Sequence, residues 1–275
     1  MKFALRIAYS GKGFCGWQKQ RAEAGDPAGL PSIQETIEAA LSKMCDEGVR
    51  IVGSGRTDAG VNALGQVAHF RSPKEKFTPD IFKNGLNSML PQEIRVLEVH
   101  PVPDAFHAQR SAVKKQYSYY FQQGPAMLPQ WMESSWWIRR TLDVTAMDEA
   151  VKVLRGEHDF RSFQASGANP GKTTVRTILE AEVVRLPMPA FPGVDLNERG
   201  FSMVRVRLVG TGFLKQMVRG IAGTLLQIGE GQRKASGMRE VLESGRRELV
   251  GPTAPAKGLT LERVWYIPDL YGNPD

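Results

Sequence analysis

The chain contains few of the residues that build disulfide or metal-bound frameworks. Its 275 residues include two cysteines, Cys15 and Cys45, and no Cys-x-x-Cys motif. This composition excludes a disulfide framework and a zinc ribbon. The four histidines lack the i, i+4 spacing of a helical metal site, and packing or hydrogen bonding explains each of them more simply. We therefore expect no metal cofactor.

Long hydrophobic runs are absent as well. No stretch approaches the ~20 apolar residues that span a membrane, and residues 1–6 begin an alternating strand pattern without the apolar core of a signal peptide. The turn at 10–13 lacks the spacing of a phosphate-binding P-loop, and the glycines at 210–212 do not form the dinucleotide fingerprint. We expect a cytoplasmic protein that uses no nucleotide cofactor.

The composition that is present is that of a basic globular protein. Hydrophobic residues make up 41% of the chain and charged residues 24%, which suffices for one large domain or two smaller ones. The formal net charge is +7. Such a surplus favours RNA, DNA or an anionic membrane as a partner. The alternative is an enzyme with a basic surface and no polyanionic partner.

Apolar periodicity predicts alternating strands and helices. The strand patterns cover residues 2–10, 49–52, 66–70, 94–99, 112–122, 175–186, 201–209 and 259–266. The helix patterns cover residues 33–46, 78–90, 145–155, 214–228 and 236–244. This order predicts an α+β protein of two similar halves, residues 1–105 and 106–275, with mainly antiparallel sheets. We expect a central basic cleft between the halves, because such clefts are the usual place for a site.

The stretch 53–61, Gly-Ser-Gly-Arg-Thr-Asp-Ala-Gly-Val, is the strongest candidate for a functional loop. It lies between two predicted strands and contains one carboxylate, Asp58, and one guanidinium, Arg56. Glycines allow positive φ angles and the close approach of a ligand, and loops at strand ends often carry catalytic groups. A tight turn in which Asp58 bonds its own backbone explains the same residues equally well.

Two features of the second half are also candidates for a functional role. Tyr117, Tyr119 and Phe121 lie on one face of the strand at 112–122, where they either stack on bases or pack in an ordinary core. Lys215 and Arg219 are four residues apart in a predicted helix and would share a face. Because the rest of that helix is apolar, we expect an anion near these two cations.

The loop at 53–61 and several other blocks resemble the TruA family of tRNA pseudouridine synthases. The blocks are Gly16-Trp17-Gln18, Gly55-Arg56-Thr57-Asp58-Ala59-Gly60-Val61, Gly65-Gln66-Val67-Ala68-His69-Phe70, Phe106-His107-Ala108, Phe160-Arg161-Ser162-Phe163, Phe213-Leu214-Lys215-Gln216-Met217-Val218-Arg219 and Ala256-Lys257-Gly258-Leu259. Each block alone is a weak signal. Their shared order along nearly the whole chain makes the resemblance specific.

The resemblance implies the pseudouridine synthase fold and the isomerisation of uridine to pseudouridine in tRNA without a cofactor. The family's catalytic aspartate falls on Asp58, which would act at C1′ or at C6 of the target. Tyr117 would stack on the uracil, and Arg219 would pair with Asp58 and hold it ionised. Arg56 would help to displace the target nucleotide from the RNA helix, since a stacked base hides its reacting atoms.

The resemblance also implies an RNA-binding block and a set of targets. The block comprises Phe106, His107, Ala108, Gln109 and Arg110, and Lys172 would contribute from the loop at 164–174. By resemblance the substrate is the anticodon stem-loop of several tRNAs, at nucleotides 38 to 40, and the enzyme is a homodimer.

Two departures from the family pattern are visible. Asn62 follows the motif where histidine is expected, and Gln109 replaces an arginine, with Arg110 displaced by one residue. They put the RNA contacts and tRNA positions in question more than the reaction. Two other functions remain open because fold and chemistry do not fix a substrate. One is a synthase for another RNA or position, and the other is a non-catalytic RNA-binding module on the same scaffold.

Overall fold

The computed structural model describes residues 1–18, 29–165, 173–188 and 195–270. Contacts within the chain define two compact units. Unit 1 comprises Met1–Lys115 and Leu261–Asp275, and unit 2 comprises Gln116–Thr260. The chain therefore leaves unit 1 in one strand and returns to it in another. None of the helices in the described ranges is long and apolar enough to cross a membrane.

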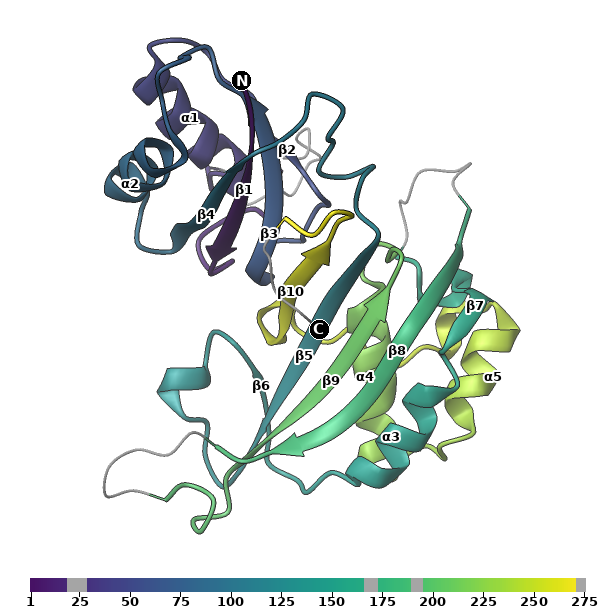
Figure 1. The fold of residues 1–275 in the computed structure, drawn as a ribbon. Coiled ribbons are helices and arrows are strands. Elements are labelled where there is room, and N and C mark those ends of the chain that lie inside the picture. Colours follow the sequence, from purple (N-terminus) through teal and green to yellow (C-terminus); the bar gives the residue numbers. More distant parts are fainter. Residues whose placement is uncertain (19–28, 166–172, 189–194, 271–275) are drawn as a thin grey trace. The chain divides into compact units, whose positions relative to one another are not determined.

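The sheet of unit 1 is built on the N-terminal strand. Its strands are β1 (Lys2–Tyr9), β2 (Val52–Gly53), β3 (Asn62–Arg71), β4 (Ile94–Pro101) and β10 (Leu259–Trp265), in the order β4-β1-β3-β10 with β2 paired to β3. β1 runs antiparallel to both of its neighbours, and Leu5 stands opposite Ala68 and Val99. The alternation of apolar residues in β1 thus places one set of side chains in the core (Figure 1).

Two helices cover one face of this sheet (Figure 1). They are α1 (Ile33–Cys45) and α2 (Pro79–Met89). The predicted capping box is present at the start of α1, where Ser32 and Glu35 bond each other's backbone N–H groups. Phe82 of α2 packs on Phe3 and Phe70, with ring centroids 5.1 and 5.0 Å away. These fully buried rings join helix and sheet into the core of unit 1.

Unit 2 has a second set of mainly antiparallel strands. They are β5 (Lys114–Gln123), β6 (Trp136–Ile138), β7 (Gly156–Asp159), β8 (Val175–Leu186) and β9 (Ser202–Gly210), in the order β5-β9-β8-β7. β6 pairs with β5 in parallel, and Phe121 stands opposite Trp136. The helices are α3 (Val144–Lys152), α4 (Met217–Gly229) and α5 (Gly237–Ser244). In this unit α3 packs on β8, and α4 and α5 pack on α3 (Figure 1).

Short 3-10 segments complete the described elements, at Pro129–Trp131, Arg161–Phe163, Arg247–Leu249 and Ala256–Gly258. The most apolar helix is α4, in which eleven of thirteen residues are buried. Gly223 of α4 allows a loop to cross closely, because a Cβ there would lie 1.7 Å from the Pro252 carbonyl oxygen. The residues after α5 are thereby held against the first turns of α4.

The predicted α+β class with mainly antiparallel strands is confirmed. Two local predictions were wrong, and the strands β6 and β7 were not predicted. The expected strand at 49–52 is reduced to Val52–Gly53. The helix expected from 214 begins only at Met217, because Gln216 has a left-handed φ of 60°. Lys215 therefore precedes the helix, and the expected shared face with Arg219 does not exist. The division into residues 1–105 and 106–275 remains a prediction.

Candidate active site

Asp58 lies in the loop between β2 and β3, which belongs entirely to unit 1. Asp58 is half-buried, whereas Arg56, two residues earlier, is exposed. The peptide group after Asp58 closes a turn, because the Val61 N–H donates to the Asp58 carbonyl at 3.1 Å. This hydrogen bond therefore fixes the backbone of the loop, while the Asp58 carboxylate remains partly exposed.

The first half of the loop is fixed by β3. The Ser54 N–H donates to the Val67 carbonyl at 2.7 Å, and the Ser54 hydroxyl bonds Gln66 Oε1 at 2.7 Å. The same glutamine donates from Nε2 to the Gly55 carbonyl at 3.0 Å. Gln66 is fully buried. One amide side chain thus holds two consecutive residues of the loop, which is why this polar group is tolerated in the core.

The second half of the loop is fixed by β1 and the turn after it. The Tyr9 hydroxyl bonds Thr57 Oγ1 at 2.8 Å, and the Trp17 N–H donates to the Thr57 carbonyl at 3.1 Å. Burial raises the pKa of Tyr9 to about 12, so its hydroxyl stays neutral. Gly16 has φ of 106°, and a Cβ there would lie 2.7 Å from the Thr57 oxygen. Thr57, next to Asp58, is therefore held at both its side chain and its backbone.

Asn62, the departure from the family pattern beside this loop, has a structural contact. Its Oδ1 accepts a hydrogen bond of 2.9 Å from the Gly11 N–H, and both residues are buried. Gly11 itself packs on the backbone at the end of the loop, since a Cβ there would lie 2.4 Å from the Val61 oxygen. Asn62 therefore joins the turn after β1 to the end of the loop.

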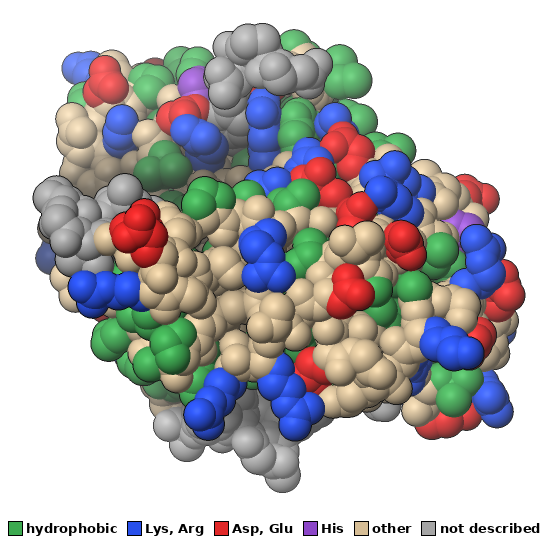
Figure 2. All heavy atoms as spheres, turned by 90° about the horizontal axis from the view of Figure 1, so that it is seen from below, with side chains coloured by type: hydrophobic (Ala, Val, Ile, Leu, Met, Phe, Trp, Pro, Cys, Tyr) green, Lys and Arg blue, Asp and Glu red, His purple; other side chains and the backbone are tan. Residues whose placement is uncertain are grey.

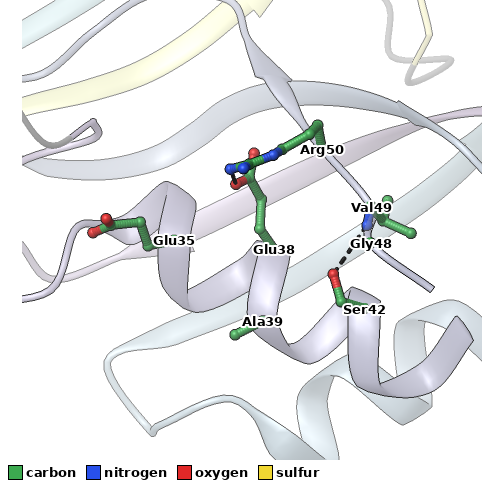
Figure 3. Close-up of a pocket in the computed structure, with 7 residues that line it drawn as sticks. All are labelled: Glu35, Glu38, Ala39, Ser42, Gly48, Val49 and Arg50. Atoms are coloured by element: carbon green, nitrogen blue, oxygen red, sulfur yellow. Dashed lines mark hydrogen bonds and ion pairs between the residues drawn. The ribbon is translucent and has the colours of Figure 1, made fainter. Parts of the chain in front are cut away.

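A cavity of about 290 Å³ in unit 1 lies beside α1, away from Asp58 in the chain. It is lined by Glu35, Glu38, Ala39, Ser42, Gly48, Val49 and Arg50 (Figure 3). Glu38, only 6% exposed, accepts from Arg50 Nη1 and from the Ile51 N–H at 2.8 and 2.9 Å. Ser42 Oγ accepts from the Val49 N–H at 3.0 Å. These contacts hold the segment that leads into β2 and the loop. We therefore assign a structural role to the polar side chains that line the cavity.

Tyr117 and Tyr119 are both buried in unit 2. The ring of Tyr117 meets Phe213 edge to face, with centroids 5.0 Å apart and an interplanar angle of 75°. The Tyr119 hydroxyl donates to the Pro255 carbonyl at 2.9 Å, and burial raises the pKa of Tyr119 well above its usual value. Tyr119 is thus a neutral core residue. Tyr117 is the tyrosine whose aromatic pair suits stacking against a base.

Arg219 is the third residue of α4 and is held by the loop that crosses this helix. Its Nε donates to the Ala254 carbonyl at 2.7 Å, and the Ala254 N–H donates back to the Arg219 carbonyl at 3.2 Å. One residue therefore fixes both the backbone and the guanidinium of Arg219. With Nε engaged, the remaining N–H groups keep a set direction, as planar recognition of a carboxylate requires.

The predicted RNA-binding block lies in unit 1 and is fixed through Ala108. The Ala108 N–H donates to His69 Nδ1 at 3.1 Å, and its carbonyl accepts from the Tyr266 hydroxyl at 2.7 Å. Burial, followed by nearby cations, lowers the pKa of His69 to about 4, so the ring stays a neutral acceptor at pH 7. Phe106 packs on Tyr266, with centroids 5.1 Å apart. Ala108 is fully buried and is therefore a support for its neighbours.

The exposed members of the block are Gln109 and Arg110. Their N–H groups donate to His107 Nδ1 at 3.2 and 3.3 Å, and burial together with Arg110 lowers the pKa of His107. Lys172 lies outside the described residues. In the view of Figure 2, lysine and arginine side chains are interspersed with aspartate and glutamate side chains.

The structure thus places Asp58, Arg56 and the block Phe106–Arg110 in unit 1, and Tyr117 and Arg219 in unit 2. The motif blocks include Thr57 and Gln66, but they do not show that these side chains support the loop. Tyr9 and Lys115, which also contact the loop, lie outside the blocks. No group of three or more potential metal ligands occurs in the described part of the chain.

Comparison with known proteins places this site in a family. A family model described as tRNA pseudouridine synthase matches residues 6–109 and 150–266, more than half of the chain. A tRNA pseudouridine synthase A of Syntrophotalea carbinolica is 40% identical over 264 residues, with 96% of each chain covered. One of Oleidesulfovibrio alaskensis is 40% identical over 271 residues, again covering 96% of each. One of Bdellovibrio bacteriovorus is 39% identical over 272 residues, covering 98% of this chain and 96% of its own.

These similarities, with the α+β fold and the carboxylate-bearing loop, define an isomerase that forms pseudouridine. The chain belongs to the tRNA pseudouridine synthase family. The resemblance noted from the motifs is thereby confirmed.

Proposed function

We propose that this chain isomerises uridine to pseudouridine in the anticodon stem-loop of tRNAs, at nucleotides 38 to 40, with Asp58 as the essential carboxylate. Membership of the family supports the reaction and the class of RNA. The observation that carries the role of Asp58 is the fixed loop, which holds Thr57 at its hydroxyl and carbonyl while Asp58 stays half-exposed. A core turn would have no need to expose a carboxylate on such a support.

The reaction breaks the N1–C1′ bond, rotates the freed base and forms a C5–C1′ bond. C5 then loses its proton and N1 gains one, so atoms balance without an oxidant or a reductant. Asp58 supplies a nucleophile or charge stabiliser at C1′ or C6, as carboxylates do in glycoside hydrolysis. A carboxylate needs no base to activate it at pH 7.

Two residues of unit 2 complete the proposed site. Tyr117 stacks on the uracil, and its edge-to-face contact with Phe213 supports its ring. Arg219 pairs with Asp58 and keeps it ionised and aimed, with its guanidinium oriented by the Ala254 carbonyl.

The RNA is bound mainly through its phosphates and is opened at the target. Arg56, exposed on the loop, enters the RNA helix and helps to displace the target nucleotide. Arg110 and Gln109, with Lys172, contact phosphates without reading sequence. Phe106, His107 and Ala108 support these contacts, since Ala108 itself is buried. We further propose a homodimer that works in the cytoplasm.

Mapping pseudouridines in cells that lack this protein tests the proposed targets. We expect pseudouridine to disappear at nucleotides 38 to 40 of several tRNAs, to return with the wild-type gene, and to stay absent with Asp58→Asn. Loss of sites elsewhere would favour the alternative of a synthase for another RNA or position. No lost site in any RNA would favour a non-catalytic RNA-binding module.

A further inference from the structure

Lys115 makes a contact with the catalytic loop that the proposed reaction does not use. Its Nζ donates to the Ser54 carbonyl at 2.6 Å. Both residues belong to unit 1, although they are 61 residues apart in the chain. The ammonium also lies against Gly55, since a Cβ on Gly55 would stand 3.0 Å from Nζ. Lys115 therefore reaches the backbone of the loop at its first turn.

This lysine carries its charge in an unfavourable place. Burial lowers the pKa of Lys115 from 10.5 to about 8. Among the described residues, no carboxylate forms an ion pair with it, and the Ser54 carbonyl is its hydrogen-bond acceptor. A partly desolvated cation with a carbonyl partner opposes folding more than an apolar side chain of the same length would. A residue that stability alone does not require is a candidate for a functional role.

We propose that Lys115 is a positioning residue, which fixes the Ser54–Gly55 peptide and thereby the course of the loop through Arg56 to Asp58. The inference rests on the proposed function of Asp58. Gln66 holds the next carbonyl, that of Gly55, and Tyr9 holds Thr57. Lys115 thus completes the support on the N-terminal side of Arg56, from a strand that is distant in the chain.

The position of Lys115 in the sequence gives this contact its significance. Lys115 precedes Tyr117 by two residues in β5, so both side chains project to the same side of the strand. A hydrogen bond from Lys115 therefore joins the first residues of β5 to the backbone of the loop within unit 1. A charged donor makes this bond stronger than a neutral one would be.

The test compares Lys115→Met with Lys114→Met as the matched control. Lys114 is the preceding residue of the same strand, and its Nζ lies over the Trp265 ring at 4.6 Å rather than at the loop. In single-turnover assays on unmodified tRNA, we expect Lys115→Met to lower the maximal rate by about tenfold or more and to change the tRNA concentration at half-maximal rate by less than about threefold. Lys114→Met should leave the maximal rate unchanged.

Thermal unfolding separates positioning from a structural role. Because Lys115→Met removes a partly buried charge, we expect its Tm to be equal to or above that of the wild type. A merely structural lysine would lower the Tm and the rate together.

The substitution Gly55→Ala tests the same contact by changing the loop instead of Lys115. Its Cβ would crowd the ammonium at 3.0 Å and weaken the bond to Ser54, so we expect a loss of maximal rate in the same direction but smaller. In the Lys115→Met background, Gly55→Ala should then cost little further activity, because the contact is already gone.

Three outcomes would overturn the inference. They are an unchanged rate for Lys115→Met, a loss explained by a lower Tm, or equal effects of Gly55→Ala in both backgrounds. If Lys115→Met does not fold, an unchanged rate for Gly55→Ala alone overturns it.

The variant Asp58→Asn distinguishes failure of this inference from failure of the proposed function. If Asp58→Asn is inactive and Lys115→Met fully active, only the present inference fails, whereas an active Asp58→Asn removes the proposed function of Asp58.

Discussion

Arg219 illustrates how single residues are fixed in this protein. Its guanidinium is oriented by the backbone of Ala254, which accepts from Nε and donates to the Arg219 carbonyl. This arrangement requires the loop to cross α4 closely, which Gly223 permits. The charge of Arg219 and the orientation of its guanidinium are therefore separate properties, and a substitution can remove one without the other.

We predict that Arg219→Lys, which keeps the charge, lowers the maximal rate of pseudouridine formation by about tenfold or more, because lysine offers no planar fork and cannot use Ala254 in the same way. Binding of tRNA should change by less than about threefold, since the charge that attracts phosphate remains. Single-turnover rates and filter-binding titrations measure the two effects. Arg239→Lys, in an exposed ion pair with Glu243 of α5, is the control. Equal losses in rate and binding would mean that Arg219 only contacts RNA.

At the scale of elements, the segment after β4 that contains Ala108 is held in place by the neutral imidazole of His69 in β3. His69 accepts from the Ala108 N–H, and its folded-state pKa of about 4 lies below the ordinary value of 6.5. The unfolded chain therefore binds more protons between these two pH values, so the free energy of unfolding falls as the pH falls through this window. The fall amounts to roughly 3 kcal/mol at most, from the size of the pKa difference.

We predict that His69→Asn abolishes this part of the pH dependence. An asparagine oxygen can accept the Ala108 N–H in place of Nδ1, and it does not titrate. Urea unfolding at pH 7, 5.5 and 4 should show the wild type losing stability relative to the variant as the pH falls. A constant difference between the two proteins across this range would show that His69 is not the group responsible.

The long periodic elements could be predicted from the sequence, and the short ones could not. β1, α1 and β8 have apolar residues at regular spacing over at least eight residues, which identifies both the element and its buried face. β6 and β7 have three and four residues, too few for a period to be visible. The start of α4 was misplaced because a left-handed residue is usually signalled by a glycine, and position 216 is a glutamine.

The chemistry of the candidate site could be predicted from the sequence, but the hydrogen bonds that hold its residues in place could not. Family motifs identified Asp58 and Arg219, but the Val61 N–H that bonds the Asp58 carbonyl and the Ala254 carbonyl that orients Arg219 are backbone groups. Backbone partners leave no mark in the sequence, because any residue supplies the same N–H and C=O groups. Lys115 was visible only as a cation on the strand of Tyr117, and its contact with Ser54 needed the structure.

At the scale of the whole molecule, the net charge of +7 is the property most directly linked to tRNA. We predict that tRNA affinity falls by at least about tenfold between 50 and 200 mM salt, because bound phosphates release counterions. Arg110→Ala should make the salt dependence shallower by about one phosphate contact, and Arg239→Ala should leave it unchanged. An affinity that does not vary with salt would contradict the phosphate-contact proposal.

The central claim is that this chain forms pseudouridine in tRNA through Asp58. The most direct measurement uses purified protein and an unmodified tRNA transcript labelled with tritium at uracil C5, without added metal or nucleotide. Because C5 loses its hydrogen when the new glycosidic bond forms, we predict tritium release by the wild type and none by Asp58→Asn, which should still bind the tRNA. Release by Asp58→Asn at the wild-type rate, or no release by folded wild-type protein that binds the transcript, would contradict the account.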